Sequence, residues 1–113
     1  MGAGANPETP GRHGRRTPLQ YAAEVGFRAI VASLLKAGAE VDKAEELNGW
    51  SPLHCVAHEG HYTVVAVLLK AGATIEKESD NGLTPLIMAA VQGHELVLSE
   101  LLKAGAIDGR PYL

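Results

Sequence analysis

Hydrophobic positions recur in three blocks along the chain, and each block has the spacing of a short helix. In the third block, Ala89 and Ala90 follow Leu86 by three and four residues, which places all three on one helical face. Thr84 stands before this segment as a potential N-cap, and Pro85 occupies the first helical position, where its missing N–H costs nothing. The pattern predicts a short helix that begins at Pro85.

A second helix is predicted in the same block after a glycine. Gly93 ends the short helix in a left-handed turn, and the second helix runs from about Glu95 to Ala104, where Gly105 caps it. The residues expected to face inward are Ile30, Val31, Leu34 and Leu35 in the first block, Val64, Val65, Leu68 and Leu69 in the second, and Val97, Leu98, Leu101 and Leu102 in the third.

Two sequence landmarks recur in fixed phase. Leu-Leu-Lys-Ala-Gly-Ala occurs at 34–39, 68–73 and 101–106, with spacings of 34 and 33 residues, and a Thr/Ser-Pro-Leu triplet precedes each copy by 17 residues. Self-similarity at this period indicates a stacked repeat array. One extra residue in the 44–48 stretch accounts for the longer first period. The polar connectors end in Asn48-Gly49 and Asn81-Gly82, a signal for tight hairpin turns.

The motif Ser51-Pro52-Leu53-His54 and its in-phase copies resemble the Thr-Pro-Leu-His signature of ankyrin repeats. The resemblance implies an all-α solenoid of paired antiparallel helices joined by short β-hairpin loops. We expect one domain over 1–113, with a partial N-terminal hairpin (1–16), repeats at 17–50 and 51–83, and a third repeat with a truncated hairpin (84–113). The chain departs from the motif at Gln20 and Ile87, which replace His54, and at Phe27, which replaces the histidine found at His61 and His94.

Composition narrows the function classes. Hydrophobic residues make up 46% of the chain and aromatics only 4%, which favours close packing of slim helices. The net charge of −3 argues against a nucleic-acid binder, and the apolar run 64–69 is far too short to span a bilayer. Cys55 is the single cysteine, as is usual in reducing compartments. We therefore expect an intracellular monomer, cytoplasmic or nuclear, that binds neither membrane nor nucleic acid.

One cluster of chemically competent side chains comprises His54, Cys55, His58 and His61. His54 and His58, four residues apart, could share a helical face and hold a metal, and Cys55 with His58 could act as nucleophile and base. The resemblance implies packing instead, with the His54 imidazole bonded to the Ser51 region and neighbouring backbone. No oxyanion hole, cleft or phosphate loop is encoded. We predict no catalytic residue, no metal and no cofactor, and hence no enzyme.

The resemblance also implies that the hairpin tips and the exposed side of the short helices form a concave surface that binds another protein. Mapped onto this sequence, the predicted partner-binding residues are Arg16, Tyr21, Glu24, Val25, Leu47, Asn48, Trp50, Cys55, His58, Glu59, Asp80, Asn81, Leu83, Met88, Val91 and Gln92. Trp50 is the predicted anchor, because tryptophan is enriched in binding hot spots. An alternative is that Trp50 folds back on its own hairpin and staples it.

The predicted function is therefore a non-catalytic interaction module, a scaffold or adaptor. Two alternatives stay open from the sequence: an intramolecular regulatory segment cut from a larger enzyme or channel, and an engineered repeat binder.

Overall fold

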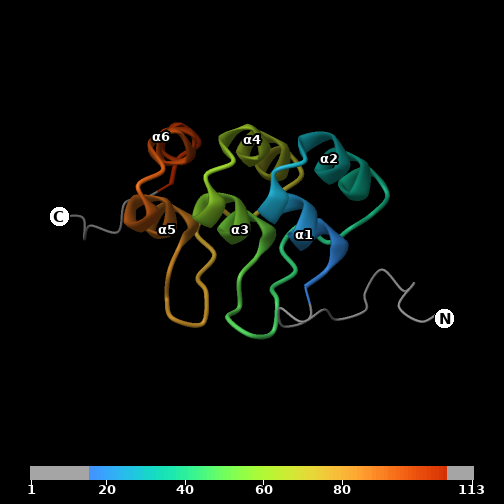
Figure 1. Ribbon diagram of the computed structural model, residues 1–113, viewed down its shortest axis with the longest axis horizontal. Helices are drawn as coiled ribbons and strands as arrows, with labels where there is room; N and C mark the ends of the chain where they lie inside the picture. Colours follow the sequence, from blue (N-terminus) through green and yellow to red (C-terminus); the bar gives the residue numbers. More distant parts are fainter. Residues whose placement is uncertain (1–15, 107–113) are drawn as a thin grey trace.

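The computed structural model describes residues 16–106, which fold into six helices and contain no β-strand. The helices are α1 (Pro18–Val25), α2 (Arg28–Lys36), α3 (Pro52–Glu59), α4 (Tyr62–Lys70), α5 (Pro85–Gln92) and α6 (Glu95–Lys103). They form three antiparallel pairs that stack side by side (Figure 1). The N-terminal hairpin predicted over 1–16, apart from Arg16, and the truncated hairpin after residue 106 lie outside the described residues.

The helices form two rows. The short helices α1, α3 and α5 pack against one another in one row, and α2, α4 and α6 pack in a second row above them, while the long connecting loops extend below the short helices (Figure 1). The predicted all-α solenoid is confirmed. The loops between the repeats fold back on themselves as predicted, but they are not β-hairpins. A β-strand requires a ladder of backbone hydrogen bonds. Across the first loop the Glu45 N–H donates to the Trp50 carbonyl, and across the second the Ser79 N–H donates to the Leu83 carbonyl.

Local chemistry explains where each short helix begins and ends. The hydroxyls of Thr17, Ser51 and Thr84 accept a hydrogen bond from the backbone N–H three residues later, and a proline follows each of them at the first helical position. Each short helix ends at a glycine with a positive φ, as Gly60 does at +86°. Each cap acts on backbone groups within about one turn of its own position, so the local sequence sets the helix bounds.

The hydrophobic core runs along the stack between the two rows, and burial depends on which repeats flank a position. Val64 and Val97 are buried, whereas Ile30 at the equivalent place in the first repeat is 48% exposed. Leu102 is 45% exposed at the other end of the stack, and Ala90 is exposed there as well. The prediction that Ile30 and Leu102 face inward is wrong, because no described repeat packs beyond the first or the third.

A column of histidines ties neighbouring repeats together. His61 Nε2 lies 2.8 Å from the carbonyl of Glu24, and His94 Nε2 lies 2.9 Å from the carbonyl of His58. Because a carbonyl only accepts, each histidine donates from Nε2 to the short helix of the preceding repeat. These imidazoles pack directly over glycines: a Cβ added at Gly60 would lie 2.7 Å from the His94 ring. The contact explains why a small residue stands opposite each histidine.

Candidate functional site

The buried side chains of Gln20 and His54 position the loop residues Trp50 and Leu83. The His54 Nδ1 accepts from the Ser51 N–H at 3.1 Å, so Nε2 carries the proton and donates to the Leu83 carbonyl at 2.8 Å. Gln20 does the same in the first repeat: its side-chain oxygen accepts from the Thr17 N–H, and its amide donates to the Trp50 carbonyl at 3.1 Å. The implied role of His54 is confirmed. The helices α1 and α3 therefore each hold the loop that follows them.

A side chain inside each loop braces it from within. The Glu45 carboxylate accepts from the backbone N–H groups of Asn48 and Trp50, and the Ser79 hydroxyl accepts from those of Asn81 and Leu83. Both side chains are buried. The loop braced by glutamate is the one with the extra residue, and the longer side chain spans the wider turn.

The Trp50 ring lies between two other predicted residues. The Arg16 guanidinium carbon is 5.8 Å from the centre of the Trp50 ring, and the His58 ring centre is 4.9 Å away at an angle of 44°. Trp50 is half-buried and packs against the core, so part of its ring surface supports the loop and part remains accessible. The ring therefore has a role in the fold itself, and its role in binding stays a prediction. The contacts fix the ring in one orientation.

Arg16 was predicted to contact a partner, but its side chain is buried. It is only 8% exposed, forms an ion pair with Glu24, and its Nε lies 3.9 Å from the Glu45 carboxylate. Burial of Glu45 explains this placement, because a buried carboxylate requires a nearby cation. The buried Arg16 guanidinium packs over the Trp50 ring.

Cys55 and Met88 are also buried, with 1% and 4% of their surface exposed, so the prediction that they contact a partner is wrong. Each follows the first residue of its helix by three positions and therefore shares a face with Pro52 or Pro85, both of which are buried. Burial raises the pKa of the Cys55 thiol to about 12. The thiol is protonated at neutral pH, which removes its nucleophilic character.

The other predicted residues lie in the row of short helices and in the loops below it. Those that are exposed are Val25, Leu47, Glu59, Asp80, Asn81, Val91 and Gln92, and those that are half-buried are Tyr21, Glu24, Asn48, Trp50, His58 and Leu83. Leu47 and Val91 stand out, because 66% and 71% of their surface is open to solvent. Their role in binding stays a prediction. Sequence reasoning missed Glu45 and noted Gln20 only as a departure from the motif.

No cluster of potential metal ligands is found among residues 16–106. This part of the chain holds no group of three or more His, Cys, Asp or Glu side chains that could bind a metal ion. Burial lowers the pKa of His54, opposed by its bond to the Leu83 carbonyl. Because both ring nitrogens of His54 are occupied by bonds within the fold, it offers no free ligand atom.

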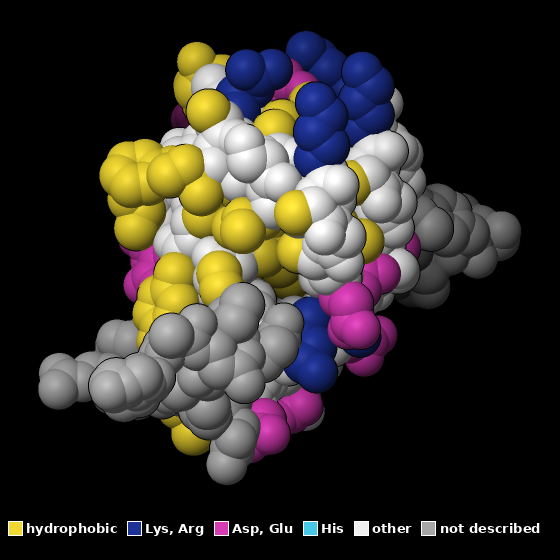
Figure 2. Space-filling model, turned by 90° about the vertical axis from the view of Figure 1, so that its right-hand side faces the viewer, with side chains coloured by type: hydrophobic (Ala, Val, Ile, Leu, Met, Phe, Trp, Pro, Cys, Tyr) yellow, Lys and Arg dark blue, Asp and Glu magenta, His cyan; other side chains and the backbone are white. Residues whose placement is uncertain are grey.

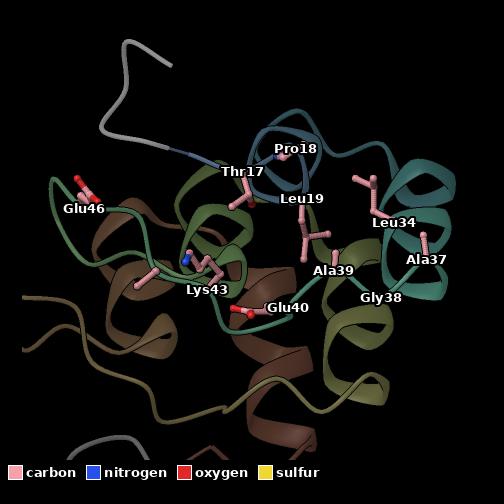
Figure 3. Close-up of a pocket in the computed structure, with 11 residues that line it drawn as sticks. Thr17, Pro18, Leu19, Leu34, Ala37, Gly38, Ala39, Glu40, Lys43 and Glu46 are labelled. Atoms are coloured by element: carbon pink, nitrogen blue, oxygen red, sulfur yellow. The ribbon is translucent and has the colours of Figure 1, made fainter. Parts of the chain in front are cut away.

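A hollow of about 680 Å³ lies at the N-terminal end of the stack. It is lined by the start of α1, the end of α2 and the connector that follows, with Leu19 and Leu34 between the two helices and Glu40, Lys43 and Glu46 on the connector (Figure 3). Leu34 is half-buried here, whereas its equivalent in the second repeat, Leu68, is fully buried. The hollow is therefore an open end of the stack, and it shares no residue with the predicted binding surface.

Comparison with known proteins identifies the repeats. A family model described as ankyrin repeats, in three copies, matches residues 19–110. No curated protein matches the chain. Among the described residues, no helix has the length and apolar character needed to cross a membrane.

Proposed function

Because the chain belongs to the ankyrin-repeat family, we propose that it is a scaffold or adaptor that binds another protein through the outer side of α1, α3 and α5 and their loops. Ankyrin repeats are generally protein–protein interaction modules and are typically non-enzymatic. The proposal assigns no catalysis to this chain. It includes an intracellular location, cytoplasmic or nuclear, and a monomeric state.

The observation that carries the proposal is the placement of Trp50. The ring is half-buried and packs beside Arg16 and His58, and the Trp50 carbonyl accepts a hydrogen bond from Gln20. An aromatic side chain that is already ordered loses little conformational freedom on binding, which favours affinity. The exposed side chains of Leu47 and Val91 extend the apolar surface on the same layer.

The framework residues explain why the surface lies here. The caps and glycines are similar in all three repeats and the inter-repeat histidine recurs in two of them, whereas Arg16, Trp50 and Leu83 occupy equivalent places with unlike side chains. A position that repeats cannot by itself specify a partner. Specificity therefore resides in the positions that differ.

Affinity capture from a cell extract tests the proposal. Wild type is compared with Trp50→Ala and with Val91→Glu, which changes a highly exposed side chain and should leave folding intact. The matched control is Leu96→Glu, since Leu96 is 58% exposed but belongs to α6 in the other row. We expect proteins that both surface variants lose and that the control retains. Partners kept by both surface variants, or lost equally by the control, would overturn the proposal.

A further inference from the structure

Charged side chains are segregated between the two rows of the stack. Within residues 16–106, the second helices α2, α4 and α6 carry four cations and two anions, for a net charge of +2. The short helices and loops carry three cations and nine anions, for a net charge of −6. Figure 2 shows the same division, with Lys and Arg gathered at the top, on the side of the second helices, and Asp and Glu mainly below. The proposed binding side is the acidic one.

The three cations of the short helices and loops leave most of the negative charge of these segments uncompensated. Arg16 is buried and its charge is used by Glu24 and Glu45. Lys43 and Lys77 are the other two cations in the described loops. Glu46, Glu59, Glu78 and Asp80 are exposed. An incoming segment therefore meets a negative potential, which attracts positive charge and repels negative charge.

Apolar side chains lie on the same layer as these carboxylates. Leu47 and Val91 are among the most exposed hydrophobic residues in the described part of the chain. Trp50 already packs against the guanidinium of Arg16, an arrangement in which a cation is attracted to the face of an aromatic ring. The surface thus combines apolar anchor points with carboxylates, and its chemistry suits an arginine or lysine side chain with a neighbouring apolar one.

From this arrangement we infer that the partner segment is cationic and amphipathic: apolar side chains contact Trp50, Leu83 and Val91, and Lys or Arg side chains lie over Glu59 and Asp80. The inference rests on the proposed function and adds the chemical class of the partner. It excludes acidic segments, which the same surface repels.

Selection from a random dodecapeptide library displayed on phage tests the inference on the full chain. Peptides that bind wild type but not Trp50→Ala or Val91→Glu are sequenced and synthesised. We expect them to carry a net positive charge with at least one apolar residue. Neutral or acidic peptides at this surface would overturn the inference while leaving the proposed surface intact. Failure to recover any peptide that depends on Trp50 or Val91 would overturn both.

Calorimetry of the selected peptides supplies a second, charge-specific readout. The variant Glu59→Gln/Asp80→Asn removes two exposed charges, and its matched control is Glu95→Gln/Glu100→Gln on α6. We expect the first variant to weaken binding about tenfold at low salt, since two exposed pairs are removed and each contributes at most a factor of about five, and the control to leave it unchanged. Affinity should also fall as salt is raised. Equal affinities for wild type and Glu59→Gln/Asp80→Asn, or an equal loss in the control, would overturn the inference that the partner segment is cationic. Dimers of the free chain that bury Trp50 would overturn it as well.

Discussion

Replacing His54 by alanine and by glutamine separates its hydrogen bonds from its ring. The imidazole is fully buried and joins the Ser51 N–H to the Leu83 carbonyl, so it links the start of α3 to the next loop. Gln20 makes the equivalent pair of bonds in the first repeat. Glutamine at position 54 can therefore satisfy the same two groups, whereas alanine can satisfy neither.

The two variants should differ clearly in stability. His54→Ala leaves two polar groups without partners, at about 1–3 kcal/mol each, and also leaves a cavity, so the expected loss is about 3–5 kcal/mol. His54→Gln should cost less than about 1.5 kcal/mol, as volume-conserving changes do. Urea unfolding followed by circular dichroism and by fluorescence of Trp50, the single tryptophan, measures both values. Equal losses for the two variants would refute the hydrogen-bonding role.

Comparison of wild type with His54→Gln also predicts how the free energy of unfolding depends on pH. Burial lowers the pKa of His54 in the folded chain, whereas the unfolded histidine has its ordinary pKa of about 6.5. The unfolded state therefore binds the proton first as the pH falls. The contribution of His54 to stability is complete above about pH 6.5 and is lost as the pH falls toward the folded pKa. His54→Gln should lose less stability than wild type between pH 7.5 and 5, and parallel losses would contradict this.

Three further predictions concern folding and reactivity. Gly60→Ala should destabilise more than Gly93→Ala: both glycines have positive φ, which costs about 1–2 kcal/mol for alanine, but only at Gly60 would the new Cβ meet a histidine ring; equal losses in urea unfolding would argue against that contact. Glu45→Ala should cost about 2–4 kcal/mol, because it removes the acceptor of two backbone N–H groups and one of the two carboxylates beside the buried Arg16, against about 1–2 kcal/mol for the uncharged brace in Ser79→Ala; reversal of this order in denaturation curves would exclude a contribution from the contact with Arg16. Cys55 should react with a thiol reagent only as fast as the chain unfolds, because burial raises its pKa to about 12; rapid labelling of the native chain at neutral pH would contradict that.

The helices could be predicted because their determinants are local. Thr17, Ser51 and Thr84 act on backbone groups within one turn, and the glycines that end the helices act at their own positions. The period of the repeats then indicates which helices are equivalent. The all-α solenoid follows from these two facts without any knowledge of long-range contacts.

The burial of individual site residues could not be predicted in the same way. Cys55 and Met88 appear variable in an alignment of the three repeats, but their exposure depends on the neighbouring helices and loops, which the sequence does not position. Arg16 is buried because folding brings it to Glu24 and Glu45, eight and 29 residues away. Ile30 shows the converse, since its pattern is that of a core residue but no described repeat covers it.

The indole of Trp50 offers the most direct test of where a partner docks. In a ¹⁵N-labelled chain it supplies the single indole N–H signal, because Trp50 is the only tryptophan, and an unlabelled partner adds none. Titration with a partner recovered by affinity capture should shift this signal together with the backbone amides of His58 and Val91, and leave the amides of α6 near Leu96 and Leu102 unchanged. A partner that binds and shifts the α6 amides while the Trp50 indole signal stays in place would contradict docking on the short-helix and loop surface.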